Sequence, residues 1–165
     1  MRESVIIWFA VLAAMVSGCG SSSPGGHTMA SHVVVSDQWA SASDAGMAAV
    51  FGVLTNTGDR DADIIAADSP AAARVELHEV VHEGGGPGVM QPKSDGFTVP
   101  AGGRHELSPG ADHLMLMHLT QPLRPGTDVT VTVRFADGST LPVTAQVRDF
   151  PGGQEPYQPG THGHG

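Results

Sequence analysis

Two histidines and two methionines fall within six consecutive positions, 113–118, of the segment DHLMLMH. In an extended strand alternate side chains share a face, so His113, Met115 and Met117 would point one way and His118 the other. An imidazole and a thioether separated by one residue can converge on one point, and such soft ligands favour Cu(I) over Zn²⁺, Mg²⁺ or Ca²⁺. The same pattern fits core methionines beside a solvated histidine, so the segment alone leaves both interpretations open.

The composition bounds the class of protein. A chain of 165 residues forms one domain with a sizeable core, and its 22 glycines and 12 prolines favour short strands joined by turns. Its net charge of -9 repels phosphate backbones, so we expect no nucleic-acid partner. The sequence holds no nucleophile–base motif and no cofactor fingerprint, so we expect a binding protein rather than an enzyme.

The elements that must position these ligands are strands. Short runs rich in β-branched residues alternate with turns built on Gly, Pro, Asn and Asp. Regularly spaced strands of this kind predict an all-β, Greek-key β-sandwich. The nine expected strand segments are 32–40, 47–58, 62–69, 73–81, 96–103, 104–110, 112–120, 128–138 and 140–149.

The N-terminus has the layout of a secretory signal. Arg2 precedes an apolar run over residues 5–16, which is too short to span a bilayer stably. The following VSGC, ending at Cys19, resembles the lipobox of bacterial lipoproteins, in which this Cys carries the lipid; the alternative is an ordinary signal peptide with a chance Cys. Because Cys19 is the one cysteine of the chain, its lipidation would exclude disulfides, thiolate zinc sites and blue-copper sites.

The chain then divides into four parts. Residues 1–18 are predicted to be a lipoprotein signal peptide, 19–31 a lipidated flexible tether, 32–150 the β domain and 151–165 a disordered tail. Mobile histidines are reasonable ligands for Cu(II), although linker composition without a role explains them equally well. The accessory candidates in the tether and the tail are His27, Met29, His162 and His164.

The long-range pattern resembles a known family. The segments SDQWA, ELHE, VPAGG, LSPG and HLMLM, spread over residues 33–149, are similar to those of the periplasmic copper chaperones called PCuAC. The resemblance implies a cupredoxin-type β-barrel or sandwich that binds one Cu(I) through two His and two Met, and that supplies copper to the CuA centre of cytochrome c oxidase. Carried over by position, the ligands are His78, Met90, His113 and Met115.

The register of Met90 departs from the family pattern. Eleven residues separate His78 from Met90 and twenty-two separate Met90 from His113, one more in each interval than the family has. Alignment without gaps would place Val89 or Gln91 at the ligand position. Turn-forming residues in both intervals can absorb an insertion, so we predict that Met90 is the ligand and that it lies on a loop.

Two further histidines border this set. His82 follows His78 by four residues and would share its face if the strand continued, which makes it either an accessory ligand or an exposed side chain. His118 would border the site from the opposite face.

These observations together predict a lipid-anchored, extracytoplasmic Cu(I) carrier on the bacterial cell membrane. By resemblance, its partners would be the CuA subunit of cytochrome c oxidase and a thioredoxin-like copper chaperone. Two alternatives remain open at this point: a copper buffering or resistance lipoprotein without a dedicated acceptor, and a metal-free β-sandwich lipoprotein of the envelope.

Overall fold

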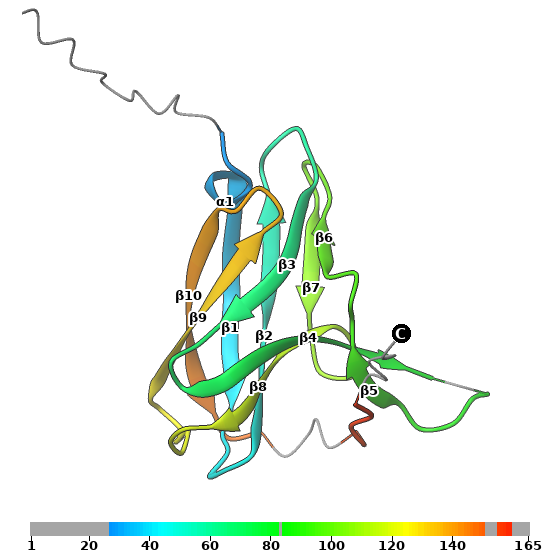
Figure 1. Cartoon of the computed structure of the whole chain (residues 1–165), viewed down its shortest axis with the longest axis vertical. Coiled ribbons are helices and arrows are strands. Elements are labelled where there is room, and N and C mark those ends of the chain that lie inside the picture. Colours follow the sequence, from blue (N-terminus) through cyan, green and yellow to red (C-terminus); the bar gives the residue numbers. More distant parts are fainter. Residues whose placement is uncertain (1–26, 83, 151–154, 160–165) are drawn as a thin grey trace, which may run out of the picture.

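Alternating apolar and polar residues form ten strands in this chain (Figure 1). The structure, a computed structural model, describes residues 27–82, 84–150 and 155–159. One short helical turn precedes the strands. The elements are α1 (Met29–His32), β1 (Val33–Ser41), β2 (Met47–Asn56), β3 (Ala62–Asp68), β4 (Ala72–Val81), β5 (Val89–Pro92), β6 (Phe97–Val99), β7 (Arg104–Leu107), β8 (His113–Leu119), β9 (Asp128–Phe135) and β10 (Thr140–Arg148).

Seven of these strands close into a barrel. The strand order runs β4-β8-β2-β1-β10-β9-β3, and a further pairing of β3 with β4 completes the ring. Strand β10 runs parallel to β1, which pairs with β2 in the antiparallel sense. β5 pairs with β4 outside the ring, β6 with β3 and β7 with β2. The all-β fold expected from the sequence is therefore confirmed, in its barrel form.

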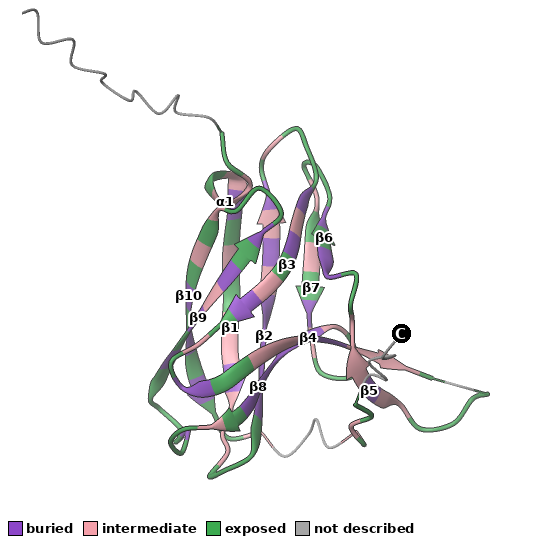
Figure 2. Cartoon of the chain, in the orientation of Figure 1, coloured by how far each residue is buried: buried purple, intermediate pink, exposed green. Residues whose placement is uncertain are grey.

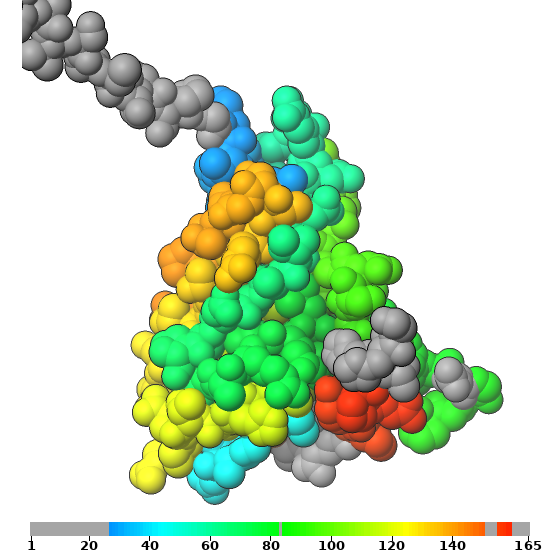
Figure 3. Space-filling model, in the orientation of Figure 1, coloured from blue at the N-terminus to red at the C-terminus, as the bar shows by residue number. Residues whose placement is uncertain are grey.

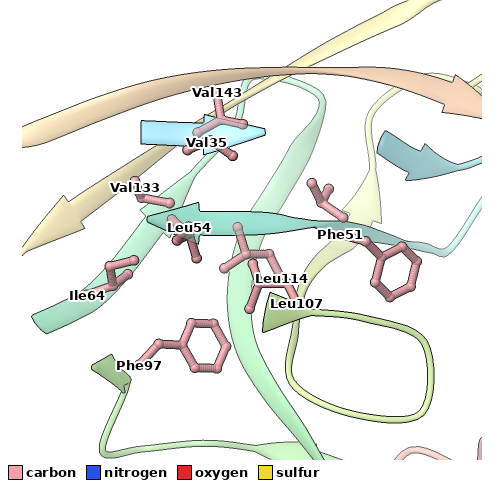
Figure 4. Close-up of a pocket in the computed structure, with 10 residues that line it drawn as sticks. Val35, Phe51, Leu54, Ile64, Phe97, Leu107, Leu114, Val133 and Val143 are labelled. Carbon is pink, nitrogen blue, oxygen red and sulfur yellow. The ribbon is translucent and has the colours of Figure 1, made fainter. Parts of the chain in front are cut away.

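The core fills the barrel interior, and burial alternates along strands such as β9 and β10 (Figure 2). Phe97, Phe135, Ile64, Leu116 and Val131 are each at most 1% exposed. A small cavity of about 20 Å³ remains among apolar side chains that include Ile64 and Phe97 (Figure 4). Because polar partners for a water are missing from its lining, this cavity is expected to stay dry.

Two neighbouring isoleucines of β3 test this assignment of the core. Ile64 is 1% exposed and lines the cavity, whereas Ile65 points outward and is 55% exposed. We expect Ile64→Ala to lower the free energy of unfolding by about 2–5 kcal/mol, because it deletes buried methylenes and enlarges a void. The matched change Ile65→Ala should stay within about 0.5 kcal/mol. Urea denaturation of the metal-free domain measures both, and equal effects would contradict the assignment.

The folded part begins earlier than the expected boundary at residue 32. Met29–His32 form a helical turn that is held to the β9–β10 turn by two hydrogen bonds. The Met29 N–H donates to Asp137 Oδ2 at 2.7 Å, and the Ala30 N–H donates to Ser139 Oγ at 3.1 Å. Residues 29–31, which were expected to belong to the tether, are therefore part of the folded domain, because a polar turn far along the chain supplies hydrogen-bond partners for Met29 and Ala30. Within the described residues, no helix combines the length and apolarity that crossing a bilayer requires.

Two elements near the candidate ligands also differ from expectation. Strand β5 was expected to be a loop, because glycines and prolines flank its four residues; pairing with β4 makes it a strand. Residues 155–159 fall in the tail that was expected to be disordered, yet they lie against β5. In both cases a neighbouring strand edge supplies backbone partners that local composition does not reveal.

Candidate metal centre

The strand register places the four candidate ligands on one face of the β5–β4–β8 sheet. His78 of β4 is directly paired with His113 of β8, and Glu76 is paired with Met115. On the other side of β4, Val80 is paired with Met90 of β5. Paired residues share a face, and so do alternate residues of one strand, so His78, His113, Met115 and Met90 all project to the same side.

This face is the outside of the barrel. Leu77, Leu114 and Leu116, which alternate with the candidate ligands, belong to the main core. Met90, Met115 and Met117 belong instead to a second buried cluster, which also contains Ala49 and Phe51 and is flanked by Trp39, Val80 and Tyr157. The site cluster, as we call this second cluster together with His78 and His113, is thus buried without being part of the barrel interior.

His78 presents a free nitrogen to the site cluster. Its side chain is fully buried, and its Nε2 lies 2.8 Å from Glu76 Oε2. Because an ionised carboxylate only accepts hydrogen bonds, Nε2 carries a proton, and in the neutral imidazole Nδ1 then keeps its lone pair. Nδ1 is buried and has no hydrogen-bond partner within the described part of the chain. A carboxylate behind the ring is also how metal-binding histidines are commonly oriented.

His113 repeats this arrangement with the opposite nitrogen. Its Nδ1 lies 2.8 Å from the Ala111 carbonyl oxygen, so Nδ1 carries the proton and donates it. Its Nε2 is buried and unpartnered among the residues that the structure describes. Burial lowers the pKa of His113, and His78 lowers it further, against the opposing effect of the Ala111 carbonyl. His113 is therefore neutral at neutral pH, as a metal ligand must be.

Glu76 holds the charge of the site, and sequence reasoning did not single it out. Burial raises its pKa, but hydrogen bonds from His78, Arg74 and Tyr157 more than offset this and lower the pKa overall. Arg74 Nε lies 2.6 Å from Glu76 Oε1, on the side away from His78. The available signal was the spacing E-x-H, since residues two apart in a strand share a face.

The register settles which residue of β5 faces the histidines. Met90 is 3% exposed and lies in the site cluster with Met115, so its placement on a loop was wrong. Gln91 is paired with Glu79, which accepts a hydrogen bond from the Gln91 amide at 3.0 Å on the opposite face. Turns lie on both sides of β5, including one at Gly96 with φ of 75°.

Aromatic rings lie along the side of the site cluster that contains His113. The Phe51 ring lies 6.0 Å from the His113 ring, and Trp39 lies 4.5 Å beyond Phe51, centroid to centroid. Phe150 packs edge-on against Trp39 at 5.0 Å. Trp39 borders the candidate ligands, because β1 pairs Trp39 with Phe51 on the outer face of the barrel.

The accessory candidates do not join this set. His82 lies beyond the end of β4 and is exposed, and His118 is exposed at a left-handed backbone position with φ of 54°. His27 and Met29 lie at the opposite end of the barrel, where the His27 ring stacks on His32 at 5.2 Å (Figure 1). Cys19, His162 and His164 lie outside the described residues.

The donor set fits a soft, monovalent metal ion. His78 Nδ1 and His113 Nε2 are buried and lack hydrogen-bond partners within the described residues, and their rings are 5.5 Å apart. A third such nitrogen, His105 Nε2, lies 3.1 Å from Asp112 Oδ2 and away from this set. Two buried thioethers lie on the same face as His78 and His113. The two thioethers carry no charge, and the ionised Glu76 is already engaged by three other side chains. Imidazole with thioether suits Cu(I), whereas Mg²⁺ and Ca²⁺ require oxygen ligands.

Comparison with known proteins gives one family. A model described as "Putative lipoprotein LpqE-like" matches residues 33–147. "Putative lipoprotein Lxx21020" of Leifsonia xyli subsp. xyli (strain CTCB07) is 45% identical over 126 residues, which cover 76% of this chain and 75% of that protein.

Solved structures give the same fold. The copper-bound PCuAC domain from PmoF2 superposes with a TM-score of 0.59 at 18% identity, covering 72% of this chain and 94% of that domain, and this likeness concerns the fold alone. The solution structure of CuI-DR1885 from Deinococcus radiodurans is 33% identical with a TM-score of 0.54, covering 73% of this chain and 82% of that one. The resemblance to PCuAC domains and the cupredoxin-like fold are thereby confirmed.

Proposed function

The chain belongs to the LpqE-like family of lipoproteins, and from that premise we propose that it is an extracytoplasmic carrier of Cu(I). The observation that carries the proposal is the pair of unpartnered nitrogens, His78 Nδ1 and His113 Nε2. A buried polar atom without a partner costs free energy, so two of them beside two buried thioethers indicate a place for a ligand. Cu(I), here a cargo, would be held by His78, Met90, His113 and Met115.

This donor set suits transfer rather than permanent storage. Thioethers are neutral and weak bases, so a His/Met site can yield Cu(I) to a site that offers thiolates. We propose the CuA centre of cytochrome c oxidase as such an acceptor. The chain holds a single cysteine, Cys19, so it has no dithiol with which to reduce oxidised CuA cysteines. A thioredoxin-like protein is therefore proposed as a second partner.

The proposed location follows from the N-terminus. Lipidation of Cys19 would hold the domain on the outer side of the bacterial cell membrane, through a segment that ends at the helical turn Met29–His32. Relatives named lipoproteins support this placement. Cys19 precedes the described residues, which begin beside α1, and α1 lies at the opposite end of the domain from β5 (Figure 1). The copper site would therefore face away from the point where the chain enters the domain.

Titration of the domain with Cu(I) against a competing chelator tests the proposal. We expect each domain to bind one Cu(I) ion tightly and then to transfer that ion to a reduced CuA domain. Binding without transfer would favour a copper buffering or resistance protein. Absence of Cu(I) binding under reducing conditions would leave a metal-free envelope lipoprotein.

A substitution in β5 tests which residue completes the site. Met90→Leu keeps the volume and the burial but removes the thioether, so Cu(I) binding should weaken by at least about tenfold. Gln91→Leu, on the opposite face, should leave the affinity unchanged. Chelator competition measures both variants. The assignment of Met90 would be contradicted if Gln91→Leu lowered the Cu(I) affinity while Met90→Leu left it unchanged.

A further inference from the structure

The C-terminal segment 155–159, which we call the cap, lies beside β5 and pairs with it through one parallel β-bridge between Met90 and Tyr157. The Met90 N–H donates to the Pro156 carbonyl oxygen at 3.0 Å, and the Gln158 N–H donates to the Met90 carbonyl oxygen at 2.9 Å. Met90 is thus held between β4 on one side and the cap on the other. An edge strand with free N–H and C=O groups readily accepts such a partner.

Tyr157 brings the cap into contact with His78. The two rings are stacked, with centroids 5.3 Å apart and planes 5° apart. The Tyr157 hydroxyl donates to Glu76 Oε2 at 3.1 Å, the same oxygen that accepts the hydrogen bond from His78 Nε2. One residue of the cap therefore contacts a candidate ligand and the carboxylate that orients it.

The cap also accounts for the burial of the site on the outer face of the barrel. His78 and Met90 project from the outer face of the β5–β4–β8 sheet, yet they are at most 3% exposed. Tyr157 is packed against the methionine cluster that contains Met90. The space-filling view shows residues 155–159 lying against the region of β4 and β5 (Figure 3).

We infer that the cap is a removable cover of the copper site, in which Tyr157 is a positioning residue for His78, and that its release controls how fast Cu(I) leaves. The inference rests on the proposed function. Few contacts hold the cap, and the entropy of ordering five residues opposes them, so it can open without unfolding the barrel. When the cap opens, the His78 ring and the free edge of β5 become accessible to an acceptor.

The experiment compares four versions of the whole chain with the original. One ends after Gln154 and lacks the cap. Its matched control ends after Pro159, which keeps the cap and removes His162 and His164. Tyr157→Leu removes the stack and the hydroxyl, whereas Tyr157→Phe keeps the stack alone.

The first readout is the rate at which a competing chelator removes Cu(I). Two variants, the chain that ends after Gln154 and the Tyr157→Leu chain, should release Cu(I) at least about tenfold faster than the original. Tenfold is the lower end of the effect expected when a residue that orients a metal ligand is lost. The chain ending after Pro159 should match the original, and Tyr157→Phe should lie between them. Equal rates in all versions that bind Cu(I) would overturn the inference.

The second readout needs no metal. In the metal-free protein, nuclear magnetic resonance should show cross-relaxation between the Tyr157 and His78 rings and slowed exchange of the Gln158 amide proton. The Tyr157→Leu change should move the His78 ring protons downfield, because the ring current of Tyr157 is lost. If neither the ring contact nor the amide protection is observed, the inference about the cap is wrong. If the cap is closed but the domain binds no Cu(I), only the proposed function is refuted.

Discussion

Replacing His113 with alanine is expected to weaken Cu(I) binding by more than about 100-fold. Losing a residue that only hydrogen-bonds to a metal ligand already lowers metal affinity by up to about 100-fold, and His113 is itself a proposed ligand. The change removes His113 Nε2, a buried imidazole nitrogen that has no hydrogen-bond partner among the described residues. Water that enters the vacated space offers a hard oxygen, which Cu(I) binds poorly. Competition with a chelator of known affinity measures the loss.

The barrel should remain folded in this variant. His113 projects from the outer face of β8, whereas the neighbouring Leu114 and Leu116 supply the core. The matched control is His118→Ala on the same strand, where the side chain is exposed. The control should keep the original affinity. If both variants bind Cu(I) as tightly as the original chain, the assignment of the site is wrong.

Replacing Cys19 with alanine is expected to abolish attachment of lipid to the protein. Each buried methylene of an acyl chain contributes about 0.8 kcal/mol to membrane binding, so losing two chains removes most of the affinity. The apolar run over residues 5–16 is too short to replace them as a stable span. Incorporation of a labelled fatty acid in growing cells measures attachment directly.

The control for this change is Ser21→Ala, two residues further along the same polar segment. It should label like the original chain and yield the same mature mass. The Cys19→Ala chain should either appear outside the membrane fraction or keep its signal peptide, which mass spectrometry distinguishes. Persistent lipid labelling of Cys19→Ala would contradict the lipobox interpretation.

Local sequence was sufficient for most of the barrel. Nine of the expected strand segments correspond to β1–β4 and β6–β10, because alternation and turn residues act within a few positions of one another. The same alternation placed His113 and Met115 on one face of a strand. The long-range pattern of motifs indicated the family and, through that resemblance, suggested His78 as a further ligand.

Tertiary contacts decided what local pattern could not. Strand β5 forms because β4 offers it an edge, and the resulting register turns Met90 toward the histidines and Gln91 away. The order of residues 155–159 likewise depends on the edge of β5, which lies more than sixty residues away in the sequence.

The sequence by itself determined the soft donor types, the β fold and the lipobox-like N-terminus, because each is written in residue identity and short spacing. The tertiary structure alone decided which nitrogens are free, since the Glu76 carboxylate and the Ala111 carbonyl select the proton position on each imidazole. It also decided that Tyr157 covers His78, a contact between segments whose approach depends on the closed barrel. Hydrogen-bond partners and burial arise from packing, and packing joins residues that no local spacing relates.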